Sequence, residues 1–400
     1  MILLLIVFKS LRQHLLSTSV TALSIALAGA LLMSVWTVKD QAQQTFANVN
    51  VGFDAVLGPR SSELQLVLNS IFHLEASPGN IEWNDYLAIQ KEPGVALAIP
   101  LSVGDNFRGY RLVGTLPALF TQNEFAPGHR FEVEPPGRIF DPSLREAVVG
   151  SFAAKKLGLK RGDEFHPYHG LNFNEKEQHA ETYVVVGILK PSNTPADRVL
   201  WIPLEGLQKM SGHTVETSTE VSAVLVKLRS SLAGKPLQLK YRQGSRLTFA
   251  WPIGGVMAQL FDKIGWFDRV LALVAYLVAI VATSSVLASI YNSMNERRRE
   301  IAILRALGAR RLTIFSSVIL ESSLIAVAGM AFAFILHVLI MTAVAHLIRA
   351  QTGVVLDPFA WNRVMIYAPV GMISVSALAG IVPAFKAYRT DVAENLVPLS

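Results

Sequence analysis

A polar stretch near the middle of the chain holds the residues best suited to binding a metal ion. Three imidazoles and three carboxylates lie close together there, at His166, His169, His179, Glu175, Glu177 and Glu181. Imidazole nitrogens and carboxylate oxygens are common ligands of Zn2+. Pro167 and Gly170 interrupt regular structure, so a tight site would have to order the loop at about 1 kcal/mol or more per residue. We therefore expect a solvated loop with weak, exchangeable cation binding, and no tight metal site.

A single carboxylate, Glu321, lies inside a long apolar stretch near one of its ends. A carboxylate within a membrane is costly enough to suggest a function. The alternative, which we favour, is a glutamate near the interface that faces water or neighbouring helices and helps to dock the basic segment before it.

The sequence supports no catalytic site. No Ser/His/Asp arrangement or pair of carboxylates can be argued from spacing, and no GxxxxGK[ST] phosphate-binding loop occurs. We therefore assign no catalytic residue and expect no bound cofactor.

Residues 295–311 carry a dense positive charge between two apolar stretches. The arginines are Arg297, Arg298, Arg299, Arg305, Arg310 and Arg311. Ile301, Leu304 and Leu307 recur at helical spacing, which predicts an amphipathic helix. Gly308 can end that helix before another begins near Arg311. Short loops rich in Lys and Arg resist translocation, so this segment either only sets orientation or also docks a cytoplasmic partner.

Four long uncharged stretches predict four membrane-spanning helices. We place the spans at residues 15–38, 269–294, 312–348 and 364–385, after an amphipathic segment at 1–14 and before a tail at 386–400. The first contains no Asp, Glu, Lys or Arg between Arg12 and Lys39, which is long enough to cross a bilayer. That length also argues against a cleavable signal peptide, the weaker alternative.

Composition and charge agree with a membrane protein. Apolar residues make up 51% of the chain, charged residues only 16%, and the mean hydropathy is +0.39. The net charge of +6 lies largely beside the spans, where topology explains it better than nucleic-acid binding. The absence of cysteine excludes disulfides and thiolate metal sites. Four spans and the basic loop predict cytoplasmic termini, an extracytoplasmic domain at residues 39–268 and a short outer loop at 349–363.

The large domain should combine helices with strands. Residues 53–57, 95–99, 147–150, 183–189 and 221–228 have the β-rich or alternating pattern of strands. Residues 64–72 have helical periodicity, and a helix from Ser151 should stop at Gly158. This pattern predicts a mixed α+β domain.

The order of residues in the basic segment closely resembles the signature of MacB/FtsX-like permeases, the type VII class of ABC transporters. The matching residues are Glu300-Ile301, Leu304-Arg305-Ala306-Leu307-Gly308-Ala309 and Glu321. Five outer stretches are similar to the MacB-like periplasmic core domain: residues 111–117, 146–150, 154–163, 186–189 and 201–204. The resemblance implies a four-helix transmembrane bundle with a large extracytoplasmic domain, made of a porter-like part and an inserted β-rich part at about 106–217.

The resemblance also implies a function. Glu300, Ile301, Leu304, Arg305, Leu307 and Gly308 would form the helix that couples to an ABC ATPase. The chain would then be a bacterial inner-membrane permease subunit, working with a second permease chain and, in some branches, a periplasmic or membrane-fusion partner. Mechanotransmission would pass the ATPase's motion to the periplasmic domain to export or extract a substrate. The alternatives are an FtsX-like, non-transporting regulator of envelope enzymes and, with less support, a membrane-anchored receptor or enzyme.

Overall fold

The computed structural model describes residues 2–48, 51–210, 219–242, 244–296 and 298–389. The chain forms two compact units. The helical unit contains Met1–Gln41, Gly265–Ala345 and Asp357–Ser400, and the α+β unit contains Ala42–Ile264 and His346–Leu356. The last part of the predicted tail, residues 390–400, lies outside the described residues.

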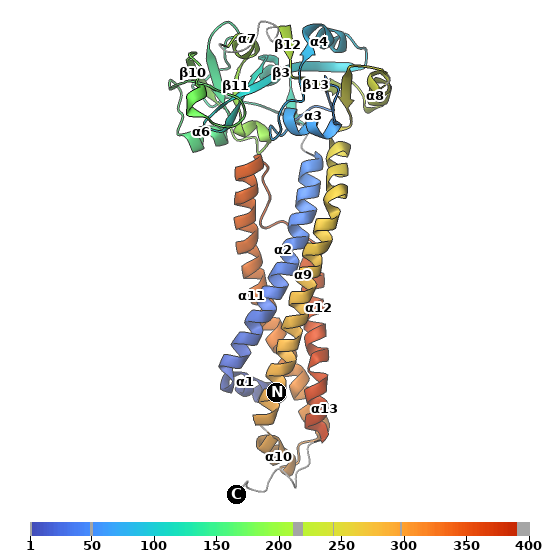
Figure 1. The fold of residues 1–400 in the computed structure, drawn as a ribbon. Helices are drawn as coiled ribbons and strands as arrows, with labels where there is room; N and C mark the ends of the chain where they lie inside the picture. Colours follow the sequence, from blue (N-terminus) through green and yellow to red (C-terminus); the bar gives the residue numbers. More distant parts are fainter. Residues whose placement is uncertain (1, 49–50, 211–218, 243, 297, 390–400) are drawn as a thin grey trace. The chain divides into compact units, whose positions relative to one another are not determined.

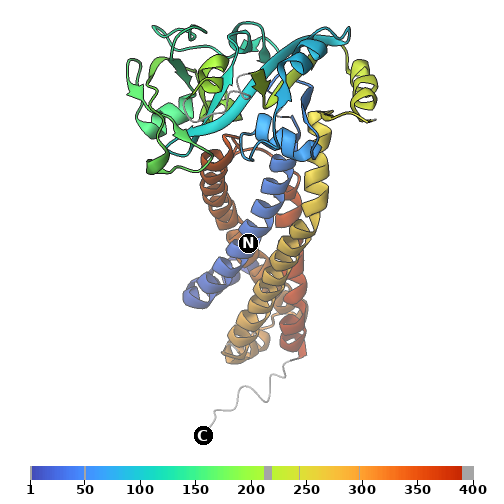
Figure 2. The ribbon, with the colours of Figure 1, turned by 45° about the horizontal axis from the view of Figure 1, so that its top comes forward.

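Seven helices contribute to the helical unit within the described ranges. They are α1 (Ile2–Gln13), α2 (Leu15–Asn48), α9 (Ile253–Glu296), α10 (Arg298–Ala306), α11 (Arg311–Thr352), α12 (Val364–Ala379) and α13 (Ile381–Arg389). Four stretches are long and apolar enough to cross a membrane: Leu15–Phe46, Arg269–Asn292, Arg311–Thr352 and Val364–Phe385. Figures 1 and 2 show these stretches gathered into one bundle, which confirms the predicted four-helix membrane part. The predicted fourth span is divided between α12 and α13.

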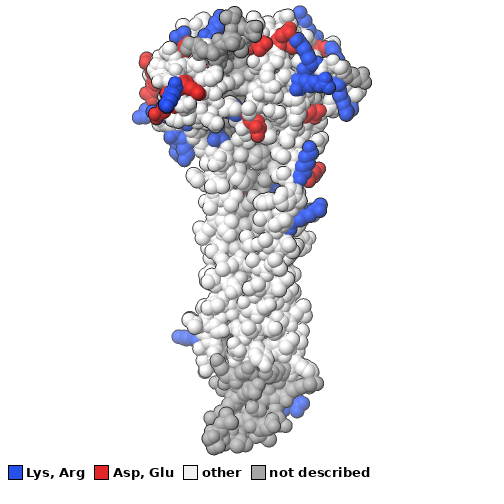
Figure 3. Space-filling model, viewed as in Figure 1, with Lys and Arg blue, Asp and Glu red and all other residues white. Residues whose placement is uncertain are grey.

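Small residues allow α2 and α11 to approach closely. A side chain added at Gly29 would lie 2.6 Å from the sulfur of Met330, and one added at Gly329 would lie 2.8 Å from the carbonyl oxygen of Ala22. Small residues let helix backbones come into van der Waals contact where lipid supplies no hydrophobic driving force. On the face drawn in Figure 3, the white surface of the helical unit is almost free of charged side chains outside the grey residues. That surface is suited to lipid.

The α+β unit is built on a sheet that follows the order β14-β1-β13-β3-β4-β11-β7-β10-β8, with β9 also paired to β3. Its strands are β1 (Ala55–Pro59), β3 (Val95–Phe107), β4 (Tyr110–Thr115), β7 (Glu146–Val149), β8 (Glu164–Phe165), β9 (Tyr168–His169), β10 (Tyr183–Ile188), β11 (Leu200–Pro203), β13 (Ala223–Leu228) and β14 (Leu247–Ala250). Two small sheets pair β2 (Ile81–Glu82) with β12 (Glu220–Val221), and β5 (Glu124–Ala126) with β6 (His129–Arg130). This mixed architecture confirms the predicted α+β class.

Short helices accompany these strands. They are α3 (Glu63–Ser70), α4 (Trp83–Gln90), α5 (Ala118–Thr121), α6 (Ser151–Leu157), α7 (Leu204–Gln208) and α8 (Gly234–Arg242). Helix α6 ends where the sequence predicts, because Gly158 adopts a φ of 72° at its C-terminus. Glycine enters this left-handed region without the steric cost that a Cβ imposes.

The long strand β3 joins the two parts of the sheet. Its first half pairs with β13, with Leu101 opposite Ala223, and its second half pairs with β4, with Asn106 opposite Arg111. Strands β4, β11, β7, β10 and β8 extend the sheet from one edge of β3, and β13, β1 and β14 extend it from the other edge.

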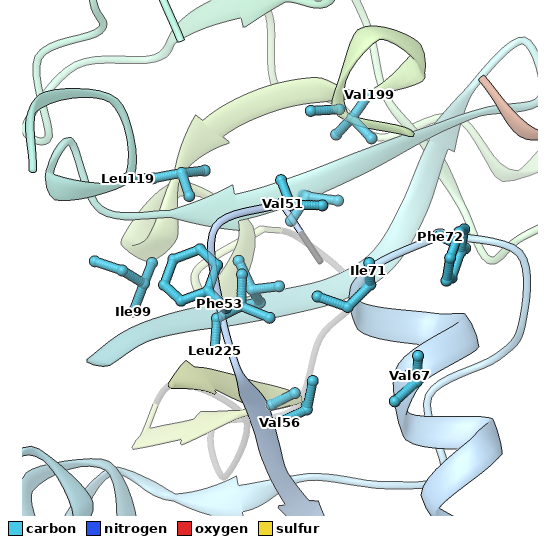
Figure 4. Packing of buried hydrophobic residues seen from close by; sticks show 14 of the residues in the cluster. Val51, Phe53, Val56, Val67, Ile71, Phe72, Ile99, Leu119, Val199 and Leu225 are labelled. Atoms are coloured by element: carbon cyan, nitrogen blue, oxygen red, sulfur yellow. The ribbon is translucent and has the colours of Figure 1, made fainter. Parts of the chain in front are cut away.

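The main core of the α+β unit collects apolar residues from distant parts of the chain. Figure 4 shows Phe53, on the segment just before β1, close to Ile99 of β3 and Leu225 of β13, with Ile71 and Phe72 following the end of α3. Phe53 is fully buried, and the other four are at most 3% exposed. Burying such side chains contributes about 1.5–3 kcal/mol each, so this cluster is a main source of the unit's stability.

The predicted outer loop at 349–363 is wrong in its extent and its character. Helix α11 continues to Thr352, and His346–Leu356 belongs to the α+β unit. Val354 is fully buried in the main core, and Ile348 packs against it. Gly353 makes the turn at a φ of 76°, where an added Cβ would lie 3.1 Å from the backbone of Pro195. Hydropathy alone could not show that this connection supplies a core residue.

We predict that Val354→Asp destabilises the protein by about 3 kcal/mol, because it leaves an unpaired charge in the main core. Thermal unfolding of the full chain in detergent measures the loss. Leu232→Asp, at a position 83% exposed in the same unit, should change stability by no more than about 0.5 kcal/mol. Equal effects of the two changes would contradict a core role for Val354.

Candidate functional site

The predicted amphipathic helix is α10, which ends just before the glycine that the sequence indicates. Gly308 has a φ of 97°. The Leu307 N–H donates to the Ile303 carbonyl at 2.9 Å, and the Gly308 N–H donates to the Arg305 carbonyl at 3.0 Å. These bonds satisfy carbonyls at the helix end, and the glycine permits the reversal toward α11.

The structure divides the predicted coupling residues by exposure. Ile301 is 6% exposed and packs in the core of the helical unit. Leu307 is 80% exposed, and Ile303, which the sequence analysis did not select, is 43% exposed. Arg305 is half-buried, and the side chains of Glu300 and Leu304 lie outside the described residues. Ile301 therefore anchors the segment within this chain, whereas Leu307 and Ile303 leave apolar side chains exposed.

Glu321 is buried against the first helix of the chain. It is 7% exposed, and the Ser10 hydroxyl of α1 donates a hydrogen bond to its Oε1 at 2.6 Å. A hydrogen-bonded carboxylate costs much less to bury than an isolated one. This contact fits the interpretation in which Glu321 faces a neighbouring helix.

A second buried polar pair joins α2 to α11. The Ser34 hydroxyl and His337 Nδ1 lie 3.0 Å apart, and both residues are at most 3% exposed. Polar contacts between spans stabilise helix association by about 0.6 kcal/mol on average. Local sequence patterns could not identify this pair, because its two members lie 303 positions apart in the chain.

The structure separates the three candidate histidines. His169 and His179 both lie beside Asp105. One possible ligand atom from each of Asp105, His169 and His179 lies within 4.8 Å of the other two. His166 lies apart from this group, with Nδ1 3.2 Å from the Glu181 carbonyl oxygen. Glu175 and Glu177 are exposed in the short 3-10 helix η1 (Glu175–Glu177). Asp105 was missed because it lies on β3, far from the histidines in sequence.

Two cavities of the α+β unit are lined by cationic side chains. The larger cavity has a volume of about 690 Å³. Its charged lining residues are four cations, Arg60, Lys235, Arg242 and Lys263, and one carboxylate, Glu63. Such a cavity is large enough for a small molecule or for part of a larger ligand. Its positive charge favours an anionic group.

The smaller cavity, about 360 Å³, contains Arg111 and Arg198. Arg111 Nη2 donates to the Glu75 carbonyl at 2.8 Å, and the Arg198 guanidinium lies 5.8 Å from the centre of the Tyr110 ring. Among the described residues, Arg111 Nη1 and Arg198 Nε are buried with no hydrogen-bond partner. Guanidinium groups bind carboxylate and phosphate through paired N–H donors, so this pocket is suited to such an anion.

His73 lines the same pocket, packed edge to face on Trp201 with ring centres 5.6 Å apart. Burial, followed by the positive charge of Arg111, lowers the pKa of His73 to about 3, with a smaller contribution from Arg198 in the same direction. His73 is therefore neutral at physiological pH, and it adds no positive charge to the arginines.

Comparison with known families and proteins finds matches over most of the chain. Residues 15–238 match the MacB-like periplasmic core domain, and residues 272–392 match the FtsX-like permease C-terminal family. "Macrolide export ATP-binding/permease protein MacB" of Shigella boydii serotype 4 is 24% identical over 348 residues, covering 79% of this chain and 49% of that protein. The same-named Escherichia coli K12 protein is 24% identical over 291 residues, covering 65% and 41%. The chain thus spans about half the length of the curated relatives it matches.

Two solved structures are also similar to the chain. The periplasmic region of MacB from Actinobacillus actinomycetemcomitans has 13% identity and a TM-score of 0.36, covering 54% of this chain and 94% of that one. The extracellular domain of the noncanonic ABC-type transporter YknZ from Gram-positive bacteria has 15% identity and a TM-score of 0.30, covering 49% and 99%.

The low pKa of His73 predicts an acid-sensitive stability. In the unfolded chain this imidazole takes up its proton near its ordinary pKa of 6.5, but the folded protein resists protonation until about pH 3. The contribution of His73 to the free energy of unfolding is therefore lost as the pH falls from about 6.5 toward 3. Between pH 7 and pH 4 we expect wild type to lose about 3 kcal/mol more of its free energy of unfolding than His73→Phe does.

Thermal unfolding of the full chain at both pH values measures this difference for wild type and variant. His129→Ala, at an exposed position, serves as the control for loss of a histidine elsewhere in the same unit. Identical pH profiles for His73→Phe and wild type would contradict the assignment.

Proposed function

The chain belongs to the MacB/FtsX-like permease family, and from this premise we propose that it transmits the motion of an ABC ATPase to its outer domain. Matching the MacB-like core domain over more than half of the chain establishes the family. Membership makes the protein a membrane permease of the type VII ABC transporter class, with a large domain outside the membrane. What we propose is the mechanism of this permease and the identity of its partners.

The exposed surface of α10 carries the proposal. Leu307 is 80% exposed at the end of this helix, and Ile303 adds a second apolar side chain. Large apolar side chains gathered on a surface are typical of contact sites. An ABC ATPase on a separate chain, using ATP and Mg, is the partner we propose. The curated relatives are named as ATP-binding/permease proteins, and this pairing of ATP binding with a permease supports coupling of the chain to an ATPase.

Three continuous helices can carry the motion. Helix α2 extends over 34 residues, α9 over 44 and α11 over 42, and the boundary between the two compact units falls within each of them. At a rise of 1.5 Å per residue, α9 is about 66 Å long. An unbroken helix transmits displacement along its axis because each turn is hydrogen-bonded to the next. Movement of α10, which directly follows α9 in the chain, would therefore be passed to the outer domain.

The outer domain is the part that we propose acts on cargo. Both of its described cavities carry an excess of cationic side chains, which favours a substrate with a carboxylate or phosphate group. We propose that the chain works as a homodimer in a bacterial inner membrane, with cytoplasmic termini and a periplasmic α+β domain, and that it exports or extracts this substrate. A periplasmic or membrane-fusion protein is a further proposed partner.

We predict that Leu307→Asp abolishes copurification of the ABC ATPase with the tagged chain, because it places a charge in an apolar contact. Ile303→Asp should weaken copurification, and Leu304→Asp is expected to act as Leu307→Asp does. Leu232→Asp, on the outer domain, is the matched control and should retain the ATPase. Full copurification with Leu307→Asp would reject α10 as the docking helix.

Ile301→Asp should behave differently from Leu307→Asp, because Ile301 is buried within this chain. We expect it to lower the thermal stability of the purified permease as well as its ATPase binding. Leu307→Asp should leave stability within about 0.5 kcal/mol of wild type. If both variants lost stability, the loss of the ATPase would reflect misfolding of the permease and not the loss of a docking contact.

The proposed topology is tested by labelling single cysteines in this cysteine-free chain. Cysteines replacing Ser61 and Asn193 should react with an impermeant maleimide added to intact spheroplasts, and one replacing Ala309 should react only after the membrane is opened. All three sites should react with a permeant maleimide, which shows that they are accessible. The reverse labelling pattern would overturn the orientation.

A further inference from the structure

The Asp105, His169 and His179 side chains form a compact cluster on the β-rich side of the outer domain. Asp105 comes from β3, His169 from β9, and His179 from the segment after η1. Asp105 Oδ1 lies 3.3 Å from His169 Nδ1 and 3.3 Å from His179 Nε2. One carboxylate oxygen therefore lies close to two imidazole nitrogens.

The two nitrogen–oxygen contacts are within range of a hydrogen bond or an ion pair, and their lengths also match those around a bridging cation. A tetrahedral Zn2+ with ligands at about 2.0–2.1 Å separates its ligand atoms by about 3.3 Å. Both nitrogen–oxygen separations equal this value. A charge-assisted N–H···O bond is shorter, at about 2.7–2.9 Å. Two of the three separations between ligand atoms are thus those expected around one metal ion, and all three atoms lie within 4.8 Å of one another.

The backbone holds the three ligands in place without a metal. Asp105 is the register partner of His169 in the antiparallel pairing of β3 with β9. An isolated β-bridge joins Tyr168 to Gln178, and the His179 N–H donates to the Pro167 carbonyl at 2.9 Å. The backbone pairing of each segment therefore fixes the position of the side chain that it carries.

This pairing removes the main argument against a metal in this region. The sequence analysis supposed that the ion would have to order a loop at a large entropic cost. In the structure the loop is already fixed by sheet pairing, and a ligand from another strand replaces His166. Preorganised ligands on rigid elements are what a metal site requires.

Burial also favours a cation. The Asp105 side chain is 0% exposed, His179 is 5% exposed and His169 is 54% exposed. A buried carboxylate is costly unless it is paired with positive charge or binds a metal. The exposure of His169 gives an ion access from solvent and leaves room for water as a fourth ligand. Two imidazoles with one carboxylate suit Zn2+ and similar transition metals, whereas Mg2+ and Ca2+ prefer oxygen ligands alone.

We propose that Asp105, His169 and His179 bind one divalent transition-metal ion, with Zn2+ as the best-fitting probe. The bound ion would tie β3, β9 and the segment before β10 together. Such a link would brace the inserted part of the outer domain on the side that carries His169.

The test uses the full chain in detergent, stripped with a chelator and titrated with zinc chloride by calorimetry. We expect one zinc ion per chain with a submicromolar dissociation constant, and an increase in thermal stability on binding. His169→Ala and His179→Ala should each weaken binding about 100-fold or more, since removing even an indirect support of a ligand costs about 10–100-fold. His166→Ala is the matched control and should bind as wild type does.

Circular dichroism of each metal-free variant shows whether it folds, and His169→Ala, at a half-exposed position, is the variant least disturbed by the change itself. Wild-type protein that folds but binds no zinc in the submicromolar range would overturn the proposal. Unchanged binding in folded His169→Ala and His179→Ala, or equal loss in His166→Ala, would also overturn it by placing the metal elsewhere.

Discussion

The pairing of strand β3 along both of its edges is the constraint on which the outer domain depends. Its 13 residues must satisfy backbone donors and acceptors in the interior of a sheet, where an unpaired group would be costly. Satisfying them brings together β4, which directly follows β3 in the chain, and β9 and β13, which lie farther along it. The two parts of the sheet are therefore folded around one strand, and the cluster of Asp105, His169 and His179 lies where β9 pairs with β3.

The membrane part depends on a different balance. Lipid provides no hydrophobic force between apolar helices, so close packing at Gly29 and Gly329 and polar contacts between helices carry the association. Glu321 with Ser10, and His337 with Ser34, are the buried examples among the described residues. Each pair joins helices from opposite ends of the sequence and satisfies a group that would otherwise be costly in hydrocarbon. Glu321 and His337 thus each have a polar partner on another helix of this chain.

Local patterns in the sequence predicted the spans, the short helix α10 with its glycine end, and several strands, because periodicity and uncharged length act locally. They could not predict Asp105 as a neighbour of His169, since strand pairing over 64 positions leaves no local pattern. They also placed Ile301, Leu304 and Leu307 on one apolar face. Periodicity shows that a helix has such a face, but it does not show which members pack within the chain and which remain exposed.

The seating of residues 346–356 in the outer domain matters for how that domain can be produced. A fragment cut at residues 39–268 would lack Val354 and Ile348, and its main core would open an apolar hole to solvent. Such a fragment would tend to associate through that hole and lose solubility. Joining residues 346–356 to its C-terminus through a flexible linker would refill the core and give a better-behaved recombinant domain. The same hole could be filled in trans by a synthetic peptide of that sequence, which makes this segment a natural choice for a split-protein reporter of domain folding.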